Sequence, residues 1–191
     1  SREYCEEKPM KRSICISGKV AVTGGTGFIG SALVSQLRNI GAQVRIIENL
    51  ENSLKIEDGL LRCRYLVHLA ATFSPSGTGQ EDENFIITKN VLEASVRSGM
   101  SKVIIASSAA VYPAKPSIMP IPEFLGREGR PNGPYGQSKR ACEDLALEYA
   151  RKYDLCVVIA RIFNVYGPGD ASERFVPNTI RKATSGQDIY V

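Results

Sequence analysis

The segment KVAVTGGTGFIG, residues 19–30, constrains the fold more than any other part of the chain. A β-branched run ends in glycines and is followed by apolar residues at helical spacing, which predicts a buried strand, a tight turn and a helix. Gly24, Gly27 and Gly30 form a G-x-x-G-x-x-G pattern, and starting from Gly25 the same stretch reads G-x-G-x-x-G. Such a turn lets backbone N–H groups approach a pyrophosphate at a helix N-terminus. The pattern favours a dinucleotide site over a glycine-rich turn without a ligand.

Strand-like and helix-like segments alternate along the rest of the sequence. Strands are predicted at 19–25, 42–50, 64–71, 102–112 and 155–167, and helices at 28–41, 83–99 and 134–154. The strands are almost unbroken runs of apolar residues, which is typical of a parallel sheet covered on both faces. We therefore predict an α/β fold with a doubly wound parallel sheet over residues 19–191, preceded by a polar N-terminal tail over 1–18. The Pro- and Gly-rich loop 113–133 follows a strand, where open α/β sheets bind ligands.

Composition excludes several classes of function. The net charge is only +4, and no run of Lys and Arg is interleaved with aromatic residues, so nucleic acid is not an expected partner. No apolar run approaches the ~20 residues of a membrane span, so no membrane partner is expected either. One histidine and five cysteines without a C-x-x-C pair argue against a metal site. The cysteines suggest reduced thiols and a cytoplasmic location.

Glu48 lies at the end of the second predicted strand, 18 residues after Gly30. A carboxylate at this point accepts hydrogen bonds from the adenosine ribose hydroxyls and repels the extra phosphate of NADP, which favours NAD. Arg45 does not restore NADP binding, because it lies inside the strand and not at its end. The alternative is that Glu48 is a solvated charge at a strand end.

Tyr135 and Lys139, in the segment PYGQSK, are four residues apart and share a helix face. A phenol of pKa ~10 is a poor base at neutral pH. A nearby ammonium, together with the positive nicotinamide of NAD⁺, favours the phenolate and lowers its pKa. Ser108 ends the strand KVIIASS and is placed to hydrogen-bond the same substrate hydroxyl. Alone, Y-x-x-x-K also describes a solvated pair on an ordinary helix; the order of glycine turn, serine-ended strand and Tyr-Lys helix favours catalysis.

Taken together, these motifs resemble a known family. The chain is similar to the extended short-chain dehydrogenase/reductases of the NAD-dependent epimerase/dehydratase group, which act on nucleotide sugars. The similarity rests on VTGGTGFIGS, HLAA, NFIIT, ASSAAVY, PYGQSK with Glu143, and RIFNVYGPG, which together span residues 19 to 170. It implies a Rossmann sheet, NAD as cofactor, a nucleotide-sugar substrate, and a homodimer formed through the helices at 83–99 and 135–154.

The resemblance also implies roles for individual residues. Catalysis is assigned to Ser108, Tyr135 and Lys139, with Tyr135 and Lys139 also contacting the cofactor and Lys139 holding the nicotinamide ribose. The remaining residues matched to cofactor or substrate positions are Gly24, Gly27, Phe28, Ile29 and Gly30 in the pyrophosphate turn, Glu48 at the adenosine ribose, Ala70 in the cofactor channel, and Asn164 near the substrate phosphates. His68, the only histidine, matches a structural position and is expected in the core.

The same resemblance narrows the range of reactions expected of the chain. Dehydratases of the family carry acidic residues directly after the catalytic Ser or Thr, where this chain has Ala109 and Ala110. An epimerase similar to UDP-glucose 4-epimerase therefore fits better: a sugar carbon is oxidised by NAD⁺ and hydride returns to the other face. The alternatives are an NAD-binding module without catalysis, or a related sugar-nucleotide reductase or 3,5-epimerase, because Pro113 stands where most members have glycine.

Two further departures from the family pattern concern an edge strand of the sheet and the C-terminal part of the sequence. The stretch between Glu48 and His68 holds one helix-like run and no room for the usual third strand, so that edge strand is expected to be missing. The sequence ends at RKATSGQDIYV, and most of the C-terminal part that grips the nucleotide sugar is expected to be absent.

Overall fold

Five parallel strands form the centre of the fold. The computed structural model describes residues 16–73, 82–170 and 173–189; the predicted tail over 1–18 therefore lies mostly outside the described residues. The strands are β1 (Lys19–Thr23), β2 (Val44–Ile47), β3 (Cys63–His68), β4 (Lys102–Ser108) and β5 (Val157–Ile162). Their order in the sheet is β2-β1-β3-β4-β5, and every pair is parallel. The predicted α/β fold with a doubly wound parallel sheet is confirmed.

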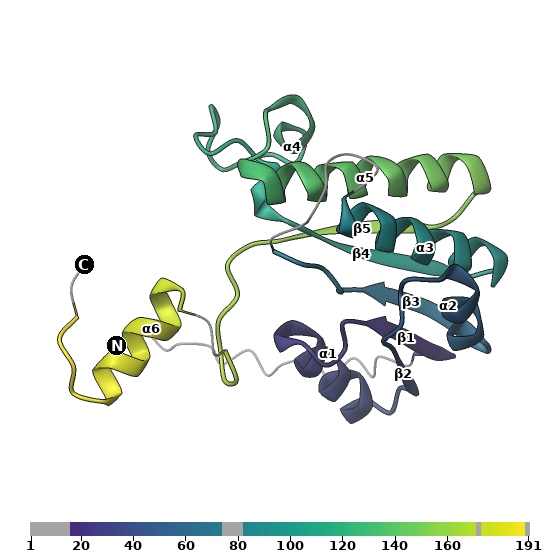
Figure 1. Ribbon diagram of the computed structural model, residues 1–191, viewed down its shortest axis with the longest axis horizontal. Helices are drawn as coiled ribbons and strands as arrows, with labels where there is room; N and C mark the ends of the chain where they lie inside the picture. Colours follow the sequence, from purple (N-terminus) through teal and green to yellow (C-terminus); the bar gives the residue numbers. More distant parts are fainter. Residues whose placement is uncertain (1–15, 74–81, 171–172, 190–191) are drawn as a thin grey trace, which may run out of the picture.

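Helices cover both faces of this sheet (Figure 1). α1 (Phe28–Asn39) packs through Val34 against Val20 and Val22 of β1 on one face. α2 (Ser53–Leu60), α3 (Glu83–Arg97) and α5 (Gly133–Tyr153) lie on the opposite face, where they bury the larger core. This arrangement follows from the strand sequence: Val20 and Val22 point to α1, and Ala21 between them points to the other core, as period-two alternation requires.

The edge strand that the sequence lacks is also missing from the fold. Between β2 and β3 the chain forms only α2, whose first turn is capped by the Asn52 side chain accepting from Leu54 N at 2.8 Å. β2 is therefore an edge strand, at the opposite end of the sheet from β5. The expectation of a shortened sheet is confirmed.

Several predicted strands are shorter in the structure. The run predicted at 42–50 forms only Val44–Ile47, and that at 155–167 forms only Val157–Ile162. The run predicted at 102–112 stops at Ser108 because the chain turns there into a short 3₁₀ helix, η2 (Ala109–Val111). The Ser108 hydroxyl accepts a hydrogen bond from Ala110 N at 3.1 Å, so the side chain itself stabilises this turn.

Among the described residues, two α-helices were not predicted. α4 (Leu125–Glu128) is a single turn within the loop 113–133, and α6 (Phe175–Thr184) follows β5 after an extended segment. In Figure 1, α6 stands apart from the sheet, on the side to which the strands' carboxyl ends point. In the part of the chain that the structure describes, no helix has the length and apolar character needed to cross a membrane.

The helices assigned to a homodimer already have partners within the chain. α3 and α5 pack against each other on one face of the sheet (Figure 1). Val91, Leu92 and Leu145, which lie on these two helices, are buried in the chain's own core. These three side chains therefore face the sheet, and the homodimer itself stays a prediction.

Candidate functional site

The glycine turn connects β1 to α1 and leaves the start of that helix open. Gly27 is the N-cap of α1 and has no side chain with which to cap the first-turn N–H groups. The turn is closed by Gly27 N donating to Gly24 O at 3.1 Å. Because the first four N–H groups of a helix have no partner within it, this end is suited to an anion.

Each glycine of the pattern has its own steric reason. Gly24 has a φ of +67°, and a Cβ there would stand 2.7 Å from Ala70 N, so the turn passes directly against the chain that follows β3. A Cβ at Gly30 would run into the carbonyl of Gly24, so glycine is required for α1 to approach the turn. A Cβ at Gly27 would meet only Gly24 O at 3.4 Å, an ordinary contact. The space above Gly27 is thus open to a ligand, and the turn fits a dinucleotide pyrophosphate.

This turn forms one wall of a cavity of about 610 Å³ at the carboxyl ends of the strands. The chain runs from β1 to β2 on one side and then crosses to β3 on the other, so the cavity opens where the strand order reverses. Open α/β sheets bind their ligands at this point. Of the predicted site residues, those that line the cavity are Gly24, Gly27, Phe28, Ile29, Gly30, Ala70, Ser108, Tyr135, Lys139 and Asn164.

Tyr135 lies in the first turn of α5, and Lys139 lies one turn later on the same face. Glycine at 136 allows α5 to approach η2 closely, because a Cβ there would run into the carbonyl of Ala110. This contact brings the start of α5 next to the residues that follow β4. The Lys139 Nζ atom lies 6.0 Å from the centre of the Tyr135 ring. The helix N-terminus and the ammonium both favour negative charge on the phenol oxygen.

The pKa of Tyr135 in the chain without a cofactor is set mainly by burial. Burial raises it above its ordinary value, and a smaller contribution from Cys142 acts in the same direction. Lys139 is itself buried and donates to Ala106 O at 3.0 Å, and burial lowers the pKa of its ammonium. In the chain without a cofactor, burial therefore raises the phenol pKa. The predicted lowering depends on the charge of Lys139 together with that of bound NAD⁺, so it stays a prediction for the cofactor-bound chain.

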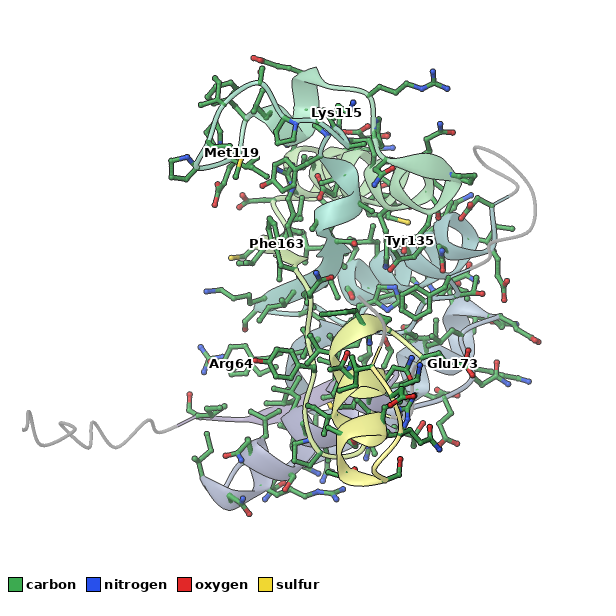
Figure 2. The ribbon with its side chains drawn as sticks, turned by 90° about the vertical axis from the view of Figure 1, so that its left-hand side faces the viewer. Arg64, Lys115, Met119, Tyr135, Phe163 and Glu173 are labelled. Carbon is green, nitrogen blue, oxygen red and sulfur yellow. The ribbon has the colours of Figure 1, made fainter. Side chains whose placement is uncertain are left out.

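Ser108 ends β4, and its half-buried side chain faces the same cavity as Tyr135. Its hydroxyl accepts from Ala110 N, which leaves the O–H proton available to a ligand. Figure 2 views this end of the molecule: Tyr135 and Phe163 lie at mid-height, the loop with Lys115 and Met119 lies at the top, and α6 stands in front of the lower part. The serine, the tyrosine and the lysine thus reach one cavity from two separate elements, β4 and α5.

Glu48 and Arg45 were both considered in the sequence analysis for the adenosine end of the cofactor. Glu48 directly follows β2, as predicted, and its side chain is exposed, but it is not among the residues that line the cavity. Arg45 lies within β2 and donates to Gly59 O of α2 at 3.1 Å. Arg45 therefore contacts the end of α2 and lies inside β2, as predicted, and not at the end of the strand. The role of Glu48 at a ribose stays a prediction.

His68 lies in the core, as predicted. It is buried at the end of β3, hydrogen-bonded to Thr23 Oγ1 at 2.6 Å through Nδ1 and to Thr88 Oγ1 at 3.3 Å through Nε2. Burial, with a smaller contribution from Lys139, lowers the pKa of His68 to about 3. The imidazole is therefore neutral at ordinary pH and ties β1, β3 and α3 together.

Sequence reasoning missed several residues of the cavity. Phe73 follows β3, is 78% exposed, and lies with its ring centre 5.2 Å from that of Tyr135. Asn132 precedes α5, and Arg174 precedes α6; both also line the cavity. None of the three belongs to a pattern with a fixed spacing. An aromatic residue two positions after the HLAA segment was the one available signal.

The chain is similar to a known protein family and to several of its members. A model of the NAD dependent epimerase/dehydratase family matches residues 20–191. UDP-glucuronic acid decarboxylase 1 of Arabidopsis thaliana is 32% identical over 197 residues, which cover 86% of this chain and 45% of the relative. The chain spans about half the length of the curated relatives it matches.

Solved structures agree in fold. The UDP-N-acetylglucosamine 4-epimerase of Bacillus cereus superposes with a TM-score of 0.81 at 29% identity, covering 92% of this chain and 63% of that protein. The UDP-glucose 4-epimerase of Thermus thermophilus, solved in complex with NAD, superposes with a TM-score of 0.74 at 26% identity, covering 90% of this chain and 64% of that protein. The remaining third of each neighbour has no counterpart here.

Proposed function

The chain belongs to the NAD dependent epimerase/dehydratase family, and from that premise we propose that its cavity is the cofactor and catalytic part of a nucleotide-sugar 4-epimerase. NAD, the cofactor predicted from the sequence, is the cofactor of the family. One observation carries the proposal: a single cavity is lined by the glycine turn, Ser108, Tyr135 and Lys139, which come from distant parts of the chain.

Residues of the turn bind the cofactor in this proposal. The open N–H groups at the start of α1, with Gly24 and Gly27, hold the pyrophosphate, and Ala70 lines the path between its two halves. Lys139 holds the nicotinamide ribose, and Glu48 selects NAD over NADP. When bound, NAD⁺ would supply reversible hydride transfer at a sugar carbon.

The chain's own residues move the proton. Tyr135 as phenolate accepts the proton of the sugar hydroxyl and gives it back when the ketone is reduced, so no proton is gained or lost over the cycle. Ser108 donates its free O–H to the same sugar oxygen and orients it. The raised pKa of Tyr135 in the chain alone means that the charge of Lys139 and the positive cofactor together must offset burial.

Decarboxylation is a second candidate, because UDP-glucuronic acid decarboxylases are among the relatives. Both reactions begin with oxidation at the same sugar carbon. A ketone at C4 of a glucuronic acid stands β to the carboxylate, which favours loss of CO₂. The same Ser108, Tyr135 and Lys139 would serve the first step of either reaction, so the site by itself does not separate them.

The discriminating experiment offers the two substrates in parallel. The purified chain, with NAD⁺ added, is incubated with UDP-glucose and with UDP-glucuronic acid, and products are resolved by chromatography. We expect UDP-galactose from the first and unchanged substrate from the second. Release of CO₂ from UDP-glucuronic acid without epimerisation of UDP-glucose would favour the decarboxylase. NAD⁺ binding by calorimetry without either product would favour a binding module. The homodimer and the cytoplasmic location remain predictions.

A further inference from the structure

A buried polar network lies directly behind the cavity. Glu143 of α5 is only 1% exposed and pairs with Arg161 of β5, whose side chain is 13% exposed. The pairing is bidentate: Arg161 Nε donates to Glu143 Oε1 at 2.8 Å, and Arg161 Nη2 donates to Glu143 Oε2 at 2.7 Å. Ser107 Oγ donates to Glu143 Oε1 at 2.5 Å. Two parallel charge-assisted bonds fix the relative orientation of both groups.

The network holds the two elements that carry the proposed catalytic residues. Ser107 is the neighbour of Ser108 at the end of β4. Glu143 lies one turn after Lys139 and two turns after Tyr135, on the same face of α5. The bond between Ser107 and Glu143 therefore joins the strand of the serine to the helix of the tyrosine and lysine. Arg161 clamps this junction from β5.

Arg161 also reaches the loop between η2 and α5. Its Nη1 atom donates to Glu123 O at 2.5 Å and to the Tyr112 hydroxyl at 3.2 Å. The loop passes so close that a Cβ at Gly126 would run into the guanidinium. The far end of the same loop returns to the cavity, where Asn132 N donates to Ala110 O at 2.8 Å. The Arg161 guanidinium thus contacts Tyr112, which directly follows η2, as well as Glu143 of α5 and the loop at Glu123.

A buried ion pair such as Glu143–Arg161 is by itself weak evidence for a role in stability. Burying two charges costs free energy that their attraction often fails to repay, and apolar replacements of similar size are frequently neutral or stabilising. What a bidentate buried pair adds is a single fixed geometry. Neither Glu143 nor Arg161 lines the cavity that contains Ser108, Tyr135 and Lys139, so neither touches a substrate in that cavity; Arg161 lines a second cavity, of about 690 Å³. Their effect on chemistry must act through the residues that they hold.

We propose that the Glu143–Arg161 pair is a positioning device that sets Ser108 against Tyr135 and Lys139 and ties the loop 113–132 to the same frame. This inference rests on the proposed function for its catalytic consequence. Its structural consequence is independent: without the pair, η2 and the loop lose their fixed position. A displacement of about 1 Å in reacting groups can lower a rate by ~100-fold.

The test compares variants that separate charge, geometry and stability. In Glu143→Gln/Arg161→Met both charges are removed, so no charge is left buried without a partner. In Arg161→Lys the charge is kept but the two-pronged geometry is lost. The matched control is Glu57→Gln/Arg97→Met, which removes an Arg–Glu pair of the same 2.7 Å length between α2 and α3, with side chains 33% and 39% exposed. Each variant is measured for melting temperature, kcat and KM with UDP-glucose, and amide exchange at Ala110 and Tyr112.

We expect the double variant at the network to fold, with kcat lowered by ~100-fold and KM changed less than about threefold. Exchange at Ala110 and Tyr112 should accelerate by at least about tenfold, since their amides bond to Ser108 Oγ and Ala109 O. Arg161→Lys should show the same losses, and the control should show none of them.

Two outcomes would overturn the inference: wild-type kcat in both network variants, or unchanged exchange at both amides. If the double variant does not fold, Arg161→Lys decides alone. If the wild-type chain turns over neither substrate, the proposed function fails, and the exchange measurement still decides whether the pair positions Ser108 and the loop.

Discussion

Substitution of two glycines in the β1–α1 turn separates the fold from the ligand site. Gly30→Ala places a methyl group against the carbonyl of Gly24 and within 2.8 Å of Gly25 Cα. These are backbone atoms that cannot rotate away, so the cost is near the upper end of the 1–3 kcal/mol typical of overpacking, about 3 kcal/mol. Alanine recovers about 1 kcal/mol of helix propensity in α1. The net loss is about 2 kcal/mol.

Gly27→Ala is the matched partner. Its methyl group meets only Gly24 O, at 3.4 Å, and faces the cavity. The fold should tolerate it at a cost of about 1 kcal/mol or less, because alanine is a weaker N-cap residue than glycine. A cofactor phosphate, however, would meet the methyl group where it now meets a bare backbone. We expect the dissociation constant for NAD⁺ to rise by at least about tenfold, which is ~1.4 kcal/mol.

Thermal melting and calorimetric titration with NAD⁺ measure the two effects. Gly30→Ala should melt about 4–8 °C below the wild type, at ~2–4 °C per kcal/mol for a domain of this size. Gly27→Ala should melt at most ~2–4 °C below the wild type and bind NAD⁺ more weakly. Wild-type affinity in Gly27→Ala would show that the pyrophosphate lies elsewhere, and a wild-type melting temperature in Gly30→Ala would refute the steric argument.

Three further predictions concern single side chains. His68 is neutral when folded because its pKa is lowered to about 3, whereas the unfolded value is near 6.5. The neutral imidazole therefore stabilises the fold above pH 6.5, and this contribution is lost as the pH falls. From pH 7 to 5, the unfolding free energy of the wild type, measured by urea titration, should fall by ~2 kcal/mol more than that of His68→Gln. Equal losses in the two proteins would contradict this. Phe73→Ala removes a ring that shields Tyr135, so the phenol pKa, followed by ¹³C-tyrosine NMR, should fall toward its ordinary value; no change would assign the burial to other neighbours. Glu48→Arg should shift the ratio of NAD⁺ to NADP⁺ affinity toward NADP⁺ by about tenfold, ~1.4 kcal/mol, unless Glu48 is only a solvated charge.

The fold was accessible from the sequence because its signals are local. The β-branched strand before Gly24, the helical spacing after Gly27 and the short stretch between Glu48 and His68 each fix one element or its absence. The parallel sheet then follows from the alternation of apolar runs with helices. Strand ends were less accessible, since the turn at Ser108 depends on a hydrogen bond from its own side chain.

Most residues of the site could also be predicted from the sequence, because their motifs are local. The effect of packing on the pKa of Tyr135 could not. All the predicted site residues except Glu48 line one cavity. The effect of burial, which raises the pKa of Tyr135 in the chain without a cofactor, could not be predicted, because burial is a property of the packed chain and not of residues four apart on a helix. The contact of Phe73 with Tyr135 and the bonds from Arg161 to the loop join segments far apart in sequence, so no spacing encodes them.

The most direct test replaces the proposed proton acceptor and measures cofactor binding and turnover in the same preparation. Tyr135→Phe removes one oxygen and leaves the ring beside Phe73 and Lys139. We predict that it binds NAD⁺ with an affinity near that of the wild type and converts UDP-glucose to UDP-galactose at least ~100-fold more slowly. Equal turnover by the two proteins, or the lack of NAD⁺ binding by the wild type, would contradict the account.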